Sequence, residues 1–149
     1  MHSGDPYYDR PVPVGKNAKL ELLRAIPLFA HCTKREITDI AIECDELRVP
    51  EGTDLTRQGA HGREFVVIVN GAASVTKDGE MVDRLGPGDF LGEIALLADV
   101  PRVATVTTLE PTVVLVLTDR AFERVATRIP VVRTRLLTAL AERLHNLEI

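Results

Sequence analysis

The stretch GEIALLADVPRVATVTT occupies residues 92–108 and carries most of the functional information in the chain. It is mostly apolar, which predicts that much of it is buried, yet it contains Glu93, Asp99 and Arg102. Asp99 lies just before a proline and suits an exposed loop tip. Glu93 follows Gly92 among apolar residues, where a charge is costly unless something pairs with it. Glu93 and Arg102 could therefore pair with each other, or bind a ligand that offers a hydroxyl to the acid and an anion to the base.

The composition of the 149-residue chain is that of one globular domain with a hydrophobic core. Its net charge of −4 argues against non-specific nucleic-acid binding. No apolar run reaches the roughly 18 residues that a membrane span needs. Residues 1–15 are polar, contain three prolines and lack the apolar segment of a signal peptide. We therefore expect a flexible tail at 1–15 and a single cytoplasmic domain at 16–149.

Catalytic chemistry finds little support in the residue pattern. Cys32 and Cys44 do not have a metal-binding spacing, and are expected to be reduced, buried thiols. The four histidines are scattered, although His61, between two glycines, could lie near a pocket mouth. Neither serine has the setting of a nucleophile. The sequence thus predicts no catalytic residues, no metal site and no cofactor, and indicates a protein that is not an enzyme.

Helices are expected at the start of the domain, in residues 16–45. Apolar spacing predicts a helix from Lys16 to Ile26 that a proline ends. Thr33 and Glu36 have the spacing of a capping box, which predicts the start of a second helix.

Residues 46–118 are predicted to be strands, because glycines recur every few residues and the intervening runs are rich in valine and threonine. Asn70-Gly71 and Asp78-Gly79 are short hairpin signals. The expected strands are 65–69, 72–77, 81–85, 103–108 and 112–118. Many short strands at regular spacing predict a barrel, a sandwich or a jelly roll.

Residues 119–149 are predicted to return to helix. Asp119 suits the N-cap of a helix to about Arg128, and Pro130 suits the start of a helix to about Leu147. An apolar seam on the last helix either packs on a partner helix, giving a homodimer, or folds back on its own domain; its members are Leu137, Leu140, Leu144 and Leu147. The stripe Arg120, Arg124 and Arg128 is read as a solvated face rather than a site for an acidic partner.

The cassette itself suits an anion and a sugar. Residues 93–97 could form one helical turn whose first N–H groups face an anion, and Gly92 permits close backbone approach. Arg102 would add a fixed, planar cation, and Glu93 could accept a hydrogen bond from a sugar hydroxyl.

The run GEIALL at 92–97, followed by PRVAT at 101–105, closely resembles the phosphate-binding cassette of cyclic nucleotide-binding domains. That family includes cAMP receptor proteins and the regulatory subunits of cAMP-dependent protein kinase. FVVIVNG at 65–71 and GD at 88–89 also resemble family segments, so the resemblance covers most of the chain. It implies a mainly β fold, a jelly roll with N-terminal and C-terminal helices and a cassette at 92–105.

The resemblance also implies roles at matching positions. Glu93 would bind the ribose 2′-hydroxyl, and Arg102 the cyclic phosphate, helped by N–H groups near Ala95 and Val103. Leu91 departs from the aromatic residue of many relatives. The implied ligand-binding set is Gly92, Glu93, Ile94, Ala95, Arg102, Val103 and Ala104.

Val103 bears on the base, because many cGMP-selective relatives carry threonine at that position. Its lack of a hydroxyl favours cAMP over cGMP. A base cap would come from the last helix, with Thr134, Arg135, Leu137 and Thr138 as candidates. The expected function is a cyclic nucleotide sensor that acts through its C-terminal helices on an effector protein or domain, without contacting nucleic acid or membrane. The alternative is a dimerisation or interaction module with a vestigial pocket.

Overall fold

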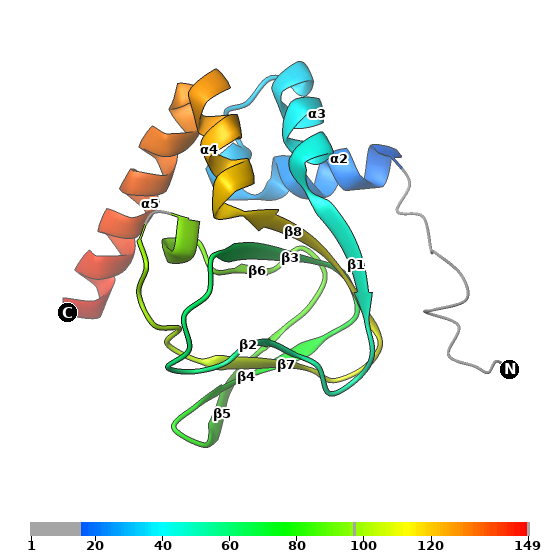
Figure 1. The fold of residues 1–149 in the computed structure, drawn as a ribbon, viewed down its shortest axis with the longest axis vertical. Coiled ribbons are helices and arrows are strands. Elements are labelled where there is room, and N and C mark those ends of the chain that lie inside the picture. The colour runs from blue at the N-terminus through cyan, green and yellow to red at the C-terminus, as the bar shows by residue number, and fades with distance from the viewer. Residues whose placement is uncertain (1–15, 97, 149) are drawn as a thin grey trace, which may run out of the picture.

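The computed structural model describes residues 16–96 and 98–148, with the side chains of all but residues 16, 139 and 142–148. The expected tail at 1–15 lies outside the described residues. Figure 1 shows helices gathered over one face of a β-roll, with the last helix descending along one side of it. No helix among the described residues is long and apolar enough to cross a membrane.

Eight strands form two antiparallel sheets, which is the expected jelly-roll architecture. The first sheet has the order β1-β8-β3-β6, with bounds Asp45–Val49, Thr112–Thr118, Glu64–Asn70 and Phe90–Leu91. The second has the order β2-β7-β4-β5, with bounds Asp54–Thr56, Thr105–Thr108, Ala73–Lys77 and Glu80–Leu85. Short β1, β2 and β6 had no separate prediction, and β7 begins two residues later than expected.

The two predicted hairpin turns have different outcomes. Asp78 and Gly79 both adopt positive φ, 51° and 83°, and join the paired strands β4 and β5. The Asn70-Gly71 prediction is wrong, because β3 and β4 belong to different sheets and do not pair. Gly71, with φ 115°, carries the chain from one sheet to the other past Thr112, whose Oγ1 would lie 2.4 Å from an added Cβ.

The flanking helices are α2 (Lys16–Ala25), the 3-10 turn η1 (Pro27–Phe29), α3 (Lys34–Glu43), α4 (Asp119–Arg128) and α5 (Pro130–Glu148). The predicted capping box of α3 is confirmed by both reciprocal hydrogen bonds between Thr33 and Glu36. The prediction of Asp119 as an N-cap is wrong. Thr118, still extended as the last residue of β8, caps α4 by accepting a hydrogen bond from the Ala121 N–H at 3.1 Å.

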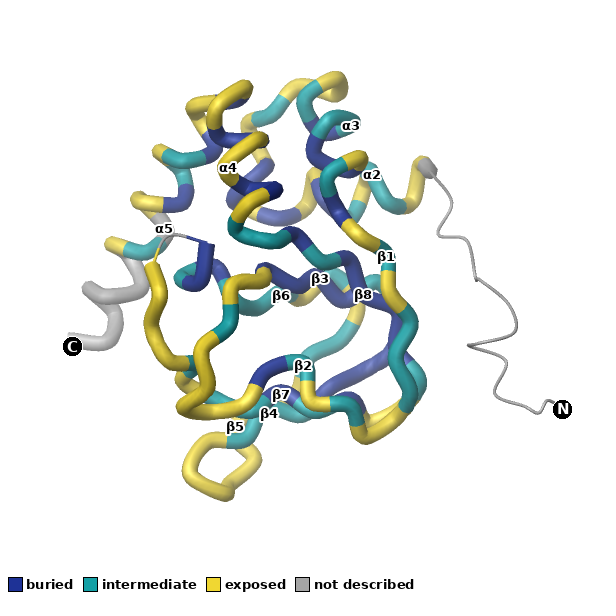
Figure 2. Tube along the Cα trace, in the orientation of Figure 1, coloured by how far each residue is buried: buried dark blue, intermediate teal, exposed yellow. Residues whose placement is uncertain are grey.

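Strands β3 and β8 separate the hydrophobic core into two parts, because alternate side chains point to opposite faces. Phe65, Val67, Leu115 and Leu117 pack under the helices. Val66, Ile68 and Val114 face the second sheet inside the roll. Figure 2 shows these central strands as the most buried part of the roll. The second core is small, which leaves room inside the roll beside it.

The arginine stripe on α4 is not simply a solvated face. Arg124 donates to Glu43 Oε1 at 3.1 and 3.0 Å, and Arg128 donates to Oε2 at 3.0 Å. The hydrogen bond from Arg124 lowers the pKa of Glu43 below its usual value, and the charge of Arg128 acts in the same direction. This cluster joins α3 to α4 and is called the Glu43 clamp below.

The last helix folds back onto its own domain over the part whose side chains are described. Val132 and Leu136 are fully buried, and Leu140 packs against the same core. Leu137 is 54% exposed, so it does not share a buried seam with Leu140. The side chains of Leu144 and Leu147 lie outside the described residues. Both cysteines are free as expected, but only Cys44 is buried, and burial raises its pKa to about 12.

Candidate functional site

A pocket of about 240 Å³ opens between the cassette and the interior of the roll. All seven residues of the implied ligand-binding set line it. Its other walls are mostly apolar and come from β2, β4, β5, β6, β7 and the cassette loop: Thr56, Val75, Leu85, Phe90, Leu91, Val100, Pro101 and Val106. The structure therefore brings one buried acid and one largely buried base to a single concave, apolar site, as small-ligand sites commonly require.

Gly92 is required by the geometry of the pocket floor. Its φ of 90° is rare for other residues. A Cβ there would lie 2.4 Å from the backbone oxygen of Glu64 and 2.6 Å from Nη1 of Arg102. Only glycine lets the cassette pass so close to β3 and to the guanidinium.

The predicted helical turn after Gly92 is present as the 3-10 turn η2 (Ile94–Leu96). The N–H of Ala95 donates to the Gly92 carbonyl at 3.1 Å, and that of Leu96 donates to the Glu93 carbonyl at 3.1 Å. The turn thus uses the Ala95 N–H in this conformation. The implied help to the phosphate from N–H groups near Ala95 and Val103 stays a prediction. Glu93 is 5% exposed and lines the pocket.

Arg102 is fixed at both its backbone and its side chain. Its N–H donates to the Ala60 carbonyl at 2.8 Å, and its carbonyl accepts from the Gly59 N–H at 2.8 Å. Nη2 donates to the backbone oxygen of Glu64 at 2.9 Å and lies 3.6 Å from Glu64 Oε2. The side chain is only 10% exposed. Burial lowers the pKa of Arg102, and the Glu64 carboxylate opposes that shift.

Gly62 and Glu64 are site residues that the sequence did not identify. A Cβ on Gly62 would lie 2.6 Å from both Nε and Nη2 of Arg102. The guanidinium therefore lies against two glycines, Gly62 and Gly92, while Glu64 holds its tip. No local pattern marks either residue, because they lie 40 and 38 positions before Arg102.

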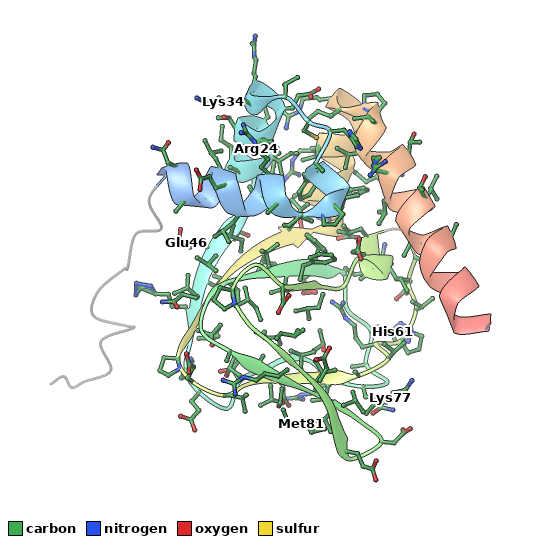
Figure 3. The ribbon with its side chains drawn as sticks, turned by 180° about the vertical axis from the view of Figure 1, so that it is seen from behind. Arg24, Lys34, Glu46, His61, Lys77 and Met81 are labelled. Atoms are coloured by element: carbon green, nitrogen blue, oxygen red, sulfur yellow. The ribbon has the colours of Figure 1, made fainter. Side chains whose placement is uncertain are left out.

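A chain of ionic contacts runs along the outer edge of the cassette. His61 Nδ1 lies 2.7 Å from Asp99 Oδ1, and Arg63 lies 3.9 Å from the same oxygen. Arg63 Nε also donates to Asp119, the first residue of α4, at 2.9 Å. The hydrogen bond with His61 lowers the pKa of Asp99. Figure 3 shows His61 at the margin of the roll, on the side where α5 descends, and Asp99 is exposed as expected.

The four base-cap candidates are not brought to the pocket. Thr134, Leu137 and Thr138 are exposed and Arg135 is half-buried. None of them belongs to the described pocket lining. Among the described residues, no group of three or more His, Cys, Asp or Glu side chains could hold a metal ion.

The fold and the cassette together match a known family profile. Residues 46–128 match the profile described as the cyclic nucleotide-binding domain. This chain belongs to the cyclic nucleotide-binding domain family. The match spans the roll and α4, and therefore includes every element that lines the pocket.

Curated relatives and solved structures agree with this assignment. A "cAMP-dependent protein kinase regulatory subunit" of Dictyostelium discoideum is 34% identical over 112 residues, which cover 70% of this chain and 34% of that protein. The Thermus thermophilus catabolite activator protein is 26% identical with a TM-score of 0.75, over 83% of this chain and 60% of that one. The regulatory domain of Toxoplasma gondii PKA, crystallised with cAMP, is 28% identical with a TM-score of 0.69, over 78% and 46%.

These relatives are regulatory proteins, and this chain carries the regulatory type of domain. It spans about a third or less of the curated relatives that it matches. The family is thus established for the domain, whereas the activity of those longer proteins is not transferred with it.

Proposed function

We propose that this domain is a non-catalytic sensor that binds cAMP in the cassette pocket. The observation that carries the proposal is that Glu93 and Arg102, both largely removed from water, line one apolar pocket. A cyclic nucleotide offers a hydroxyl and an anion on one small, partly apolar molecule. The Toxoplasma gondii relative in complex with cAMP supports the choice of ligand.

Different pocket residues contact different parts of the ligand. Arg102 supplies a charge-assisted contact to the cyclic phosphate, and Glu93 accepts a hydrogen bond from the ribose 2′-hydroxyl. Gly92 lets the backbone approach the sugar. Val103, 70% exposed beside the pocket, provides an apolar surface without a hydroxyl, which favours adenine over guanine.

Binding is coupled to the C-terminal helices through the core. Leu96 of η2 belongs to the same buried cluster as Ala121, Phe122 and Val125 of α4. A shift of the cassette around a ligand therefore changes the packing of α4, and α5 follows it. In the closed state, α5 brings one of Thr134, Arg135, Leu137 or Thr138 over the base. A ligand can shift this equilibrium only by the difference in its affinity for the two states.

Calorimetric titration with cAMP and with cGMP tests the binding proposal. We expect saturable binding of both, with cAMP the tighter, and a matching rise in thermal stability with ligand concentration. The variant Val103→Thr should reduce the preference for cAMP over cGMP by raising the affinity for cGMP. If neither nucleotide gives heat or a thermal shift at millimolar concentration, the proposal is wrong.

Self-association through α5 remains a second candidate, favoured by the 54% exposure of Leu137. Sedimentation of the wild type and Leu137→Asp tests it. Leu140 is unsuitable for this purpose because it packs in the domain's own core. A dimer that Leu137→Asp converts to monomer supports the candidate, and a monomeric wild type excludes it.

A further inference from the structure

We propose that the Glu64 carboxylate weakens nucleotide binding by competing with the ligand phosphate for Arg102. Glu64 would thus determine affinity without being needed for the pocket to form. The inference rests on the proposed function, since it concerns how tightly the same site holds its anion. Two groups of Glu64 face the guanidinium, its backbone carbonyl and its carboxylate, and they act differently.

The backbone group of Glu64 is the one that positions Arg102. Its carbonyl oxygen accepts from Nη2 at 2.9 Å, which is a good hydrogen bond. Glu64 is the first residue of β3, where it pairs with Thr118 of β8. That carbonyl is therefore held by the sheet and is retained whatever side chain the residue carries.

The carboxylate of Glu64 contributes charge rather than geometry. Its Oε2 lies 3.6 Å from Nη2 of Arg102, too far for a hydrogen bond, and accepts one from the Arg63 N–H at 3.0 Å. A negative charge at that distance still attracts the cation, because Arg102 is only 10% exposed and poorly screened by water. It lowers the net positive potential that Arg102 presents to the pocket.

An incoming phosphate is therefore opposed in two ways by the carboxylate. The ligand must share a cation that is already partly neutralised, and it places its own negative charge near that of Glu64. Glu64 and Arg102 also line a second, polar cavity together with residues of β2 and of the loop at 60–62. The Glu64 side chain is 48% exposed, so its effect is reduced by solvent but not abolished.

The test is cAMP binding by wild type, Glu64→Gln, Glu64→Asp and the control Glu51→Gln. Glu64→Gln removes the charge and keeps an acceptor for Arg63, while Glu51→Gln makes the same charge change in an exposed turn. We expect Glu64→Gln to bind cAMP about three- to tenfold more tightly at low salt. We expect Glu51→Gln to stay near the wild type, and Glu64→Asp, which keeps the negative charge, to bind cAMP less tightly than Glu64→Gln.

Ionic strength provides a readout that a purely structural role would not move. The ratio of the cAMP affinity of Glu64→Gln to that of the wild type should fall towards one as the salt concentration is raised, because salt screens the repulsion between the Glu64 carboxylate and the phosphate. Equal or weaker binding by a folded Glu64→Gln protein, checked by its melting curve, overturns the inference. A wild type that binds no cyclic nucleotide overturns the proposed function instead, so the two failures are distinguishable. A misfolded Glu64→Gln protein would show that the side chain is structural, and would overturn the inference as well.

Discussion

The Glu43 clamp and the Arg102 site each centre on one largely buried charge, but the two charges are treated differently. Glu43 is 16% exposed and accepts three hydrogen bonds from two arginines. Arg102 is 10% exposed, its guanidinium donates to the Glu64 carbonyl, and the Glu64 carboxylate lies 3.6 Å away. The first charge is saturated by its own chain, and the second is held in place but incompletely neutralised.

This difference indicates what each cluster is for. A saturated cluster gains most from staying as it is, so the Glu43 clamp fastens α3 to α4. An under-neutralised, largely buried cation costs desolvation that its own contacts do not fully offset. An anionic ligand can supply the missing part, which is why we assign binding to Arg102 and stability to Glu43.

The largest effect is expected from Arg102→Ala. It should weaken cAMP binding by about 100-fold, roughly 3 kcal/mol, because the phosphate loses its buried cation. The free energy of unfolding should change little, since the backbone clamp to Gly59 and Ala60 is kept and the exposed Glu64 is solvated. Calorimetry and denaturant unfolding measure the two quantities. Arg35→Ala, an exposed arginine on α3, is the matched control. An Arg102→Ala variant with a clearly lower free energy of unfolding but wild-type cAMP affinity would reverse the division.

Gly62→Ala should displace the Arg102 guanidinium without removing its charge. The added Cβ would meet the guanidinium at 2.6 Å, and this flexible end must shift. We expect cAMP affinity to fall about tenfold, roughly 1.4 kcal/mol, because a displaced fork no longer matches the phosphate. Stability should be nearly unchanged.

Gly86→Ala is the control for Gly62→Ala, because nothing lies within 4 Å of its added Cβ and neither glycine has positive φ. Calorimetry of both variants is the measurement. Equal affinities in the two would show that the position of Arg102 within the site does not matter.

Glu43→Gln should affect stability and leave cAMP affinity unchanged. Two arginines lose their charged acceptor, at a cost of about 1 kcal/mol at neutral pH. The pKa of Glu43 is lowered in the folded state. Its contribution to stability is therefore fully present above the usual glutamate pKa, and is lost as the pH falls below that value and through the lowered folded-state pKa. Urea unfolding of wild type and variant should therefore differ at pH 7 and converge between about pH 5 and pH 3. A constant difference across that range would show that the charge is not responsible.

Local sequence signals predicted the elements well where neighbouring residues decide them. Thr33 and Glu36 fix a helix start within one turn, and Asp78-Gly79 fixes a hairpin through its own backbone angles. Asn70-Gly71 misled because the pairing of its flanking strands depends on distant partners. The short strand β6 has only two residues and gains its identity from pairing with β3.

The candidate site was predictable to the extent that it lies in one continuous cassette. All seven residues that the long motif implied for ligand binding line the pocket, together with eight others. Gly62, Glu64 and the acceptor of the α4 arginines were not predictable, because each depends on residues 38 to 85 positions away. None of Gly62, Glu64 and Glu43 is an unusual residue type, and none lies in a sequence repeat with its partner. Only the folded chain shows that they meet.

The smallest effect is expected from Asp99→Asn, at the exposed end of the same edge. Asp99 joins His61 and Arg63, but its side chain is 58% exposed and such pairs contribute little. We expect faster amide exchange in the loop at 98–101 and a change in cAMP affinity of about twofold or less. Asp45→Asn, exposed on β1, is the control. If Asp99→Asn instead weakened binding as much as Gly62→Ala, an exposed ion pair would be controlling the buried cation. The assignment of binding to Arg102 and of stability to Glu43 could then not rest on how each buried charge is neutralised.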